Sequence, residues 1–118
     1  MNLIVAEEFI SHAGRLLDFK IECDALSDAD IAALASVIAR RIKFGAVYGV
    51  PRGGLRLANA LEPYATSGPR LIVDDVLTTG KSMVEVRDSM TDRGVVIFAR
   101  GPCPDWITPV FSLEMMFR

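Results

Sequence analysis

The chain has 118 residues, of which 51% are hydrophobic and 24% are charged. This composition is typical of a folded domain and excludes a disordered chain, which lacks the apolar residues to offset its ordering entropy. Thirteen Lys and Arg residues against fifteen Asp and Glu give a formal net charge of −2, without the basic excess of a nucleic-acid coat protein. The length predicts a single domain over residues 1–118.

The sequence carries no signal for export or membrane insertion. The longest uncharged apolar stretch, residues 31–39, is far shorter than the ~20 residues of a transmembrane helix. The N-terminus carries Glu7 and Glu8 and no early Lys or Arg, so it does not resemble a signal peptide. Cys23 and Cys103 lack metal-ligand spacing and are interpreted as reduced thiols. We therefore expect a cytoplasmic protein that contacts no membrane.

The first 26 residues are expected to form a small hood over the core. Apolar residues within positions 1–10 suggest a short helix ending near residues 12–14, and partial alternation over residues 15–23 predicts a strand. Ser27 with Asp30 three positions later resembles a capping box, ahead of a helix over residues 28–42. Cations in the last turn of that helix suit its dipole, and a solvated helix end is the ordinary explanation for them: Arg40, Arg41 and Lys43.

Residues 27–101 are expected to form an α/β core. Short apolar runs predict strands over residues 45–50, 70–75 and 95–99. Helices are expected between them over residues 54–61 and 82–93, the second ending at Gly94. The run at 70–75 shows no alternation, which is typical of a strand buried on both faces. This order predicts a parallel sheet with right-handed crossovers, in a Rossmann-like arrangement. The tail, residues 102–118, is expected to add a strand over 110–115.

Two segments at the carboxyl ends of predicted strands carry residues suited to chemistry. They are residues 50–54 (VPRGG) and residues 74–82 (DDVLTTGKS), and each leads directly into a predicted helix. Ligands of open parallel sheets bind beyond the carboxyl ends of the strands. We therefore expect both segments to face one ligand.

The second segment combines an acidic pair with a loop suited to phosphate. Two adjacent carboxylates at the end of a buried strand, Asp74 and Asp75, are costly unless they bind hydroxyl groups or a hard cation. The loop that follows consists of small, flexible or hydroxyl-bearing residues: Thr78, Thr79, Gly80, Lys81 and Ser82. Such a loop at a helix N-terminus is typical of an anion site, although alone it is equally typical of a capped turn. Together, the carboxylates and the loop outline a sugar phosphate.

Two further patterns refine this interpretation. Gly80, Lys81 and Ser82 match the end of the Walker pattern, but Asp75 stands where that pattern requires glycine, so a P-loop nucleotidase is excluded.

In the first segment, Arg52 precedes Gly53 and Gly54, and a guanidinium beside exposed amides suits a diphosphate. A tight turn with a surface arginine is the alternative there.

These segments resemble those of a known family. Residues 71–82 (LIVDDVLTTGKS) resemble the phosphoribosyl-diphosphate (PRPP) motif of type I phosphoribosyltransferases, and residues 50–54 resemble their diphosphate loop. Residues 12–21 (HAGRLLDFKI) are similar to the serine-glycine-arginine segment of orotate phosphoribosyltransferases, with Ala13 in place of the usual serine. The resemblance spans roughly residues 6–100 and is closest to the orotate enzymes.

The resemblance implies transfer of the 5-phosphoribosyl group of PRPP to a nitrogenous base, an orotate-like pyrimidine being favoured, with release of diphosphate. It assigns the 5-phosphate to Thr78–Ser82 and the ribose hydroxyls to Asp74 and Asp75. It assigns the diphosphate to Pro51, Arg52, Gly53 and Gly54, with a cis peptide expected between Pro51 and Arg52. Mg²⁺ would be held mainly by the substrate, with the two aspartates as candidate protein ligands. A homodimer acting in pyrimidine nucleotide biosynthesis is also implied.

The chain departs from the family pattern before the PRPP strand. Family members place two more strands and a long mobile loop there, but here only residues 62–70 separate the second core helix from that strand. Closure of the site is therefore expected from the N-terminal segment, the tail or a second subunit. If none of these closes it, we expect hydrolysis of PRPP or slow turnover. Phe19, Lys20 and Trp106 are candidates for the base pocket. A non-catalytic sensor of PRPP or a nucleotide remains the alternative, and an RNA-binding regulator is disfavoured by the lack of a basic stripe.

Overall fold

The computed structural model describes residues 3–5, 9–10, 16–17 and 20–112. The main strands are β5 (Val47–Gly49), β6 (Leu71–Leu77), β7 (Arg93–Ala99) and β8 (Ile107–Ser112). The helices are α1 (Asp28–Arg41), α2 (Leu55–Leu61) and α3 (Lys81–Val86), with 3-10 turns η1 (Cys23–Ala25) and η2 (Glu62–Tyr64).

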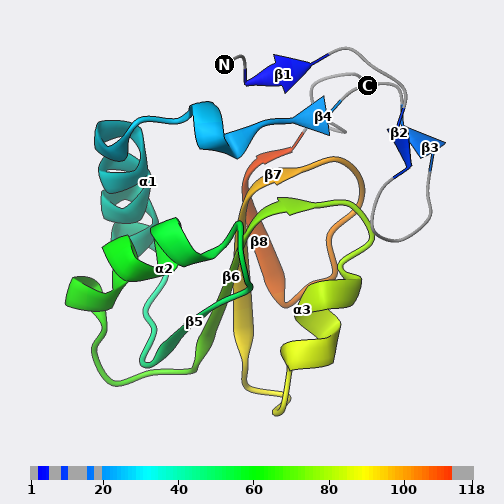
Figure 1. Cartoon of the computed structure of the whole chain (residues 1–118). Helices are drawn as coiled ribbons and strands as arrows, with labels where there is room; N and C mark the ends of the chain where they lie inside the picture. The colour runs from blue at the N-terminus through cyan, green and yellow to red at the C-terminus, as the bar shows by residue number, and fades with distance from the viewer. Residues whose placement is uncertain (1–2, 6–8, 11–15, 18–19, 113–118) are drawn as a thin grey trace.

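The four main strands form one parallel sheet in the order β5-β6-β7-β8. The central strand β6 pairs on both sides, and Val73 lies opposite Gly49 of β5 and Val95 of β7. Helices α1 and α2 lie on one side of the sheet and α3 lies on the other (Figure 1). The α/β class with a parallel sheet is therefore confirmed.

The core has one layer on each face of the sheet. Leu71 and Val73 of β6 pack with Ile31, Ala35 and Ile38 of α1, whereas Ile72, between them in sequence, packs with Met83 of α3 on the opposite face. Leu71, Ile72 and Val73 are all fully buried. This arrangement confirms the prediction that β6 is covered on both faces, as its uninterrupted apolar sequence indicates.

The described part of the hood is made of short antiparallel pairs. Strand β1 (Ile4–Val5) pairs with β4 (Lys20–Ile21), and β2 (Phe9–Ile10) pairs with β3 (Leu16–Leu17). The predicted helix in the first ten residues is therefore wrong. Isoleucine, valine and phenylalanine favour a pleated strand when a partner strand is available, and a single turn of helix gains little by itself. The strand expected over residues 15–23 is present as β3 and β4.

The side chain of Arg56 connects the hood to the core. Its Nη2 atom donates to the carbonyl of Leu26 at 2.9 Å and contacts Asp28 Oδ1 at 3.2 Å. The capping box is also present, with Asp30 N–H donating to Ser27 Oγ at 3.1 Å and Ser27 N–H donating to Asp30 Oδ2 at 2.9 Å. These contacts fix the direction in which α1 leaves the hood.

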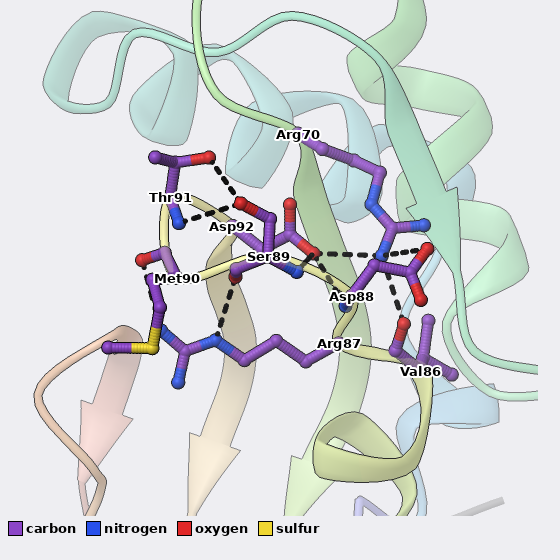
Figure 2. A network of polar contacts seen from close by, with 8 residues as sticks. All are labelled: Arg70, Val86, Arg87, Asp88, Ser89, Met90, Thr91 and Asp92. Atoms are coloured by element: carbon purple, nitrogen blue, oxygen red, sulfur yellow. Dashed lines mark hydrogen bonds and ion pairs between the residues drawn. The ribbon is translucent and has the colours of Figure 1, made fainter.

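Helix α3 is much shorter than predicted, and a buried carboxylate explains why (Figure 2). Asp92 Oδ2 accepts from the N–H groups of Asp88 at 3.0 Å and Ser89 at 3.2 Å, and from Arg70 Nη2 at 2.9 Å. Arg70 also donates to the carbonyl of Val86 at 2.9 Å. These bonds occupy backbone groups that a longer helix would use for itself.

The end of the predicted helix belongs to the sheet instead. Arg93 and Gly94 begin β7, so Gly94 does not cap a helix. A Cβ atom at Gly94 would lie 2.8 Å from Met83 Cε and 2.9 Å from Ile107 Cγ1, so the glycine allows α3 and β8 to pack closely against β7.

The expected tail contributes the outer strand of the sheet. Strand β8 runs beside β7 with Pro109 opposite Val96, and it begins three residues earlier than predicted. The Phe98 and Phe111 rings stack across the two strands, with their centroids 5.3 Å apart. Among the described residues, no helix is both long and apolar enough to cross a membrane.

Candidate functional site

The loop after β6 forms one wall of a cavity of about 220 Å³. Strand β6 continues to Leu77, so Asp74 and Asp75 lie within the strand and not at its end as predicted. Gly80 has a φ of 80°, a conformation that glycine adopts without strain, and α3 begins at the next residue. The cavity is lined by the acidic residue and the whole expected phosphate loop: Asp74, Thr78, Thr79, Gly80, Lys81 and Ser82.

The two adjacent carboxylates are half-buried and each accepts from the next backbone N–H. Asp74 Oδ1 accepts from Asp75 N–H at 2.8 Å, and Asp75 Oδ1 accepts from Val76 N–H at 2.8 Å. Burial, and then the neighbouring carboxyl of Asp75, raises the pKa of Asp74 to about 7. The free site therefore holds a carboxyl that gains a proton close to neutral pH, and a ligand that favours its charged form would displace this proton.

The Asp75 carboxylate lies against the second predicted segment. A Cβ atom placed on Gly53 would come within 2.3 Å of Asp75 Oδ2, so only glycine permits this approach. The peptide between Pro51 and Arg52 is cis, as expected. Gly54 is buried against the backbone of Val50 and Val73. The structure thus brings the 50–54 segment and the acidic pair together at the carboxyl ends of neighbouring strands.

Cys23 lies close to the same pair from the side of the hood. Burial, followed by the charge of Asp75 and other nearby carboxylates, raises the pKa of its thiol to about 12. Because the thiolate is the reactive form, burial and the raised pKa both disfavour reaction at this side chain. Its location shows that η1 covers the α1 and α2 side of the acidic pair.

Comparison with solved structures identifies the architecture. Orotate phosphoribosyltransferase from Aeropyrum pernix superposes with a TM-score of 0.71 at 22% identity, over 97% of this chain and 90% of that one. The chain has the orotate phosphoribosyltransferase fold. UMP synthase from Leishmania donovani matches with a TM-score of 0.67 at 16% identity, over 95% of this chain and 33% of that one. The Francisella tularensis orotate phosphoribosyltransferase matches with a TM-score of 0.61 at 16% identity, over 98% of this chain and 83% of that one.

Sequence comparison alone does not reveal this fold. No protein-family model matches the chain, and no curated protein matches its sequence significantly. The resemblance read from residues 50–54 and 71–82 is confirmed by the solved structures at the level of the fold.

Of the three candidate base-pocket residues, the structure describes the side chain of Trp106 alone, and it does not line the cavity. Trp106 immediately precedes β8, and Gly94 at the start of β7 donates to its carbonyl, so Trp106 lies at the sheet edge opposite to the phosphate loop. Its ring is buried in the core and has the Arg87 guanidinium 4.4 Å from its centroid. We therefore assign it no contact with a base. Phe19 and the Lys20 side chain lie outside the described residues.

The cavity includes four residues that the sequence analysis did not single out: Val76, Leu77, Met83 and Glu85. The first two belong to the part of β6 that was expected to be loop. Glu85 lies one helical turn after Lys81, a spacing that could have placed both on one face of α3. Its carboxylate adds negative charge to the rim of the cavity.

The acidic pair is compatible with the Mg²⁺ that was expected, provided that the ion takes most of its ligands elsewhere. No group of three metal-ligating side chains is present in the described ranges. Mg²⁺ commonly uses one or two carboxylates and completes its shell with water and substrate phosphates. Asp74 and Asp75 offer carboxylate oxygens of this kind beside the cavity, and they are the residues that would hold the ion.

The short connection before β6 is also confirmed. Only residues 65–70 join η2 to β6. Two more strands and a long mobile loop cannot be accommodated there. Any closure over the cavity must come from a different part of the chain or from a second subunit.

Proposed function

We propose that this protein transfers the 5-phosphoribosyl group of PRPP to the nitrogen of a base, an orotate-like pyrimidine being favoured. The bond from the nitrogen to C1 of the ribose forms as the bond from C1 to the diphosphate oxygen breaks. Diphosphate leaves with the bonding electron pair, and the proton of the base nitrogen passes to water. The reaction passes through a state that resembles an oxocarbenium ion.

One observation carries this proposal, namely the arrangement of three parts of the chain around one cavity. The acidic pair of β6 lies beside a hydroxyl-rich loop, and the glycine-rich segment touches that pair. Asp74 and the loop at residues 78–82 line the cavity, and Gly53 lies against Asp75. PRPP has its groups in the same order as these three parts. Its 5-phosphate would lie on the loop, its ribose diol on the carboxylates and its diphosphate beside Arg52. The orotate phosphoribosyltransferase fold supports the same assignment.

The protein's contribution to this reaction is positional and electrostatic. The hydroxyls of Thr78, Thr79 and Ser82 donate to the 5-phosphate and hold the ribose in place. Asp74 and Asp75 accept from the ribose hydroxyls, and their negative charge favours the cationic sugar of the transition state. Arg52 offsets charge that develops on the departing diphosphate. Mg²⁺, when bound with the substrate, supplies further charge neutralisation of the diphosphate.

The decisive measurement is diphosphate release from Mg²⁺ and PRPP with a panel of acceptors, orotate first and purine bases next. We expect orotate to accelerate the release, with one nucleotide formed for each diphosphate released above the rate without a base. An Asp74→Asn, Asp75→Asn double variant should lose binding of PRPP, whereas Glu62→Gln, which removes an exposed charge on η2, should retain it. Unaltered PRPP binding by the double variant would refute the ribose assignment.

A second candidate function is a sensor that binds PRPP or a nucleotide without turning it over. The short connection over residues 65–70 favours it, because nothing there can close over the cavity and exclude water. Tight binding of PRPP with no diphosphate release for any base would select the sensor. Release that a base accelerates, with formation of a nucleotide, would select the enzyme.

We also propose that the protein is a homodimer, because a second subunit is one way to complete a site without its own covering loop. Sedimentation equilibrium with and without PRPP tests this directly. A dimer whose association strengthens with PRPP is expected. A monomer under both conditions would mean that closure comes from the hood or the tail.

A further inference from the structure

A second hollow lies at the opposite edge of the sheet from the candidate site. Its volume is about 290 Å³. It is formed where the end of α1 meets the chain just before β6 and the beginnings of β7 and β8. The lining contains three cations and one carboxylate, Arg41, Lys43, Arg93 and Asp105, among less polar neighbours that include Trp106.

The cations come from two separate parts of the chain and are all exposed. Arg41 is the last residue of α1, Lys43 follows it by two positions, and Arg93 begins β7. Within the described part of the chain, none of these three side chains has a hydrogen-bond or ion-pair partner. Arg40 differs, because it points back along its helix and its Nε donates to the carbonyl of Ser36 at 3.4 Å. Folding therefore gathers three uncompensated positive charges around one hollow in a protein whose net charge is negative.

The charge balance indicates the kind of ligand. Three cations and one carboxylate leave an excess of two positive charges, which matches a dianion better than a single carboxylate. Two arginines offer planar forks of N–H donors that suit phosphate oxygens. The volume lies at the lower limit of the ~300–1,000 Å³ typical of ligand pockets, so the ligand is small.

We propose that this hollow is a second anion site, which binds a small phosphate-bearing anion with two or three negative charges, such as a phosphate monoester or diphosphate. It is separated from the candidate site by the length of β6, roughly 20 Å at about 3.3 Å per residue. One anion could therefore occupy it while another ligand fills the first cavity. This inference does not depend on the proposed transferase activity.

Trp106 provides a direct readout because it is the single tryptophan of the chain and lines the hollow. We expect inorganic diphosphate, titrated into the full chain in Mg²⁺-free buffer, to change Trp106 fluorescence to saturation. Arg93→Gln should weaken this binding by about tenfold or more, because it removes one charge-assisted contact. Equilibrium dialysis with radiolabelled diphosphate measures the same binding without relying on fluorescence.

Matched variants distinguish specific binding in the hollow from attraction of the anion by surface charge in general. Arg40→Gln removes the same charge from the same helix end but not from the hollow, and should leave the affinity within twofold of wild type. Asp105→Asn should tighten binding several-fold. Equal weakening by Arg40→Gln and Arg93→Gln would refute the proposal.

Two other results would also overturn it. Loss of the fluorescence change in Arg52→Gln would assign the signal to the first site. Binding of an RNA oligonucleotide, with none of diphosphate by either method, would show that the cations serve a polymer. An unaltered signal in Arg52→Gln, together with its loss in Arg93→Gln, is the outcome that supports the second site.

Discussion

Asp74 shows how a residue proposed to bind a ligand can weaken the fold that carries it. Its raised pKa means that the folded chain holds a proton more tightly than the unfolded chain does. The carboxyl is therefore neutral at low pH without cost, and its ionisation opposes folding as the pH rises from about 4 to about 7. A ligand that stabilises the charged form would offset this cost.

Asp74→Asn should consequently stabilise the ligand-free protein at pH 7.5, on the order of 1–3 kcal/mol. Urea unfolding at a series of pH values measures the difference. The gain in stability should shrink as the pH falls to 4, because Asp74 of the wild-type protein is then protonated too. The same substitution should weaken the binding of PRPP. A variant that is less stable than wild type at pH 7.5 would contradict the assigned burial effect.

Gly53 shows a different constraint, one of space. Gly53→Ala places a methyl group on the Asp75 carboxylate, which is held by its bond to Val76 N–H. We expect the carboxylate to move, so PRPP affinity should fall by about tenfold or more, equivalent to roughly 1.4 kcal/mol. Isothermal titration measures this affinity.

Gly101→Ala is the matched control, since a Cβ atom there has no neighbour within 4 Å. It should change neither PRPP affinity nor the melting temperature. If Gly53→Ala also bound PRPP like wild type, Asp75 would have no role in holding the ribose.

At the scale of elements, the turn between α3 and β7 depends on one buried carboxylate (Figure 2). Hydrogen bonds from Arg70 and from the N–H groups of Asp88 and Ser89 lower the pKa of Asp92 to about 2. The folded state thus favours ionised Asp92 more than the unfolded state does. Its contribution to stability is complete above about pH 4 and is lost as the pH falls toward 2.

Asp92→Asn should lower the melting temperature by several degrees at pH 7, and the deficit should shrink below pH 4. Differential scanning calorimetry at both pH values checks this. Asp88→Asn serves as control, because that side chain is exposed and lies 3.6 Å from Arg70, where an ion pair contributes little. A deficit of equal size at pH 2.5 would show that the charge of Asp92 is not what holds the turn.

The sequence correctly predicts a helix or strand where a local pattern determines its bounds. It misplaces the bounds where contacts with residues distant in the sequence determine them. Ser27 and Asp30 correctly mark the start of α1, and the apolar run at 70–75 correctly indicates a doubly buried strand. The spacing of Met83, Val86 and Met90 suggests a long helix, but Arg70 and Asp92 end it after six residues. The meeting of Arg70 with Asp92 depends on β6 lying beside β7, which no local pattern contains.

For the whole molecule, the candidate site was predictable because its parts are contiguous segments that follow neighbouring parallel strands. The composition of residues 50–54 and 74–82 suggests phosphate and diol binding. The parallel sheet brings the two segments together, because they follow neighbouring strands. The contact of Gly53 with Asp75 could not be predicted, since it depends on the register between β5 and β6. Trp106, a candidate for the base pocket, lies at the opposite edge because it precedes β8, which runs parallel to β7, and the sequence predicted no direction for that strand.

The short connection over residues 65–70 leads to a prediction for the intact protein. If PRPP binds as proposed, water should reach C1 of the ribose. We expect slow release of diphosphate from PRPP and Mg²⁺ without any base, at a rate well above that of PRPP in buffer alone. A phosphate-coupled assay measures both rates, and the Asp74→Asn, Asp75→Asn double variant should match buffer. A base-free rate equal to the buffer rate would indicate that another segment seals the cavity.

The two outer strands also limit how copies of this chain can meet. The carbonyl of Trp106 accepts from Gly94 N–H, so by alternation the backbone of residue 109 faces away from β7, and there a proline has no N–H to offer. The other margin, β5, is three residues long. Neither rim provides a run of free donors and acceptors, so fibrous growth by adding strands is discouraged. Copies that meet at the described edges of this sheet are therefore expected to associate through side chains, leaving each sheet at four strands.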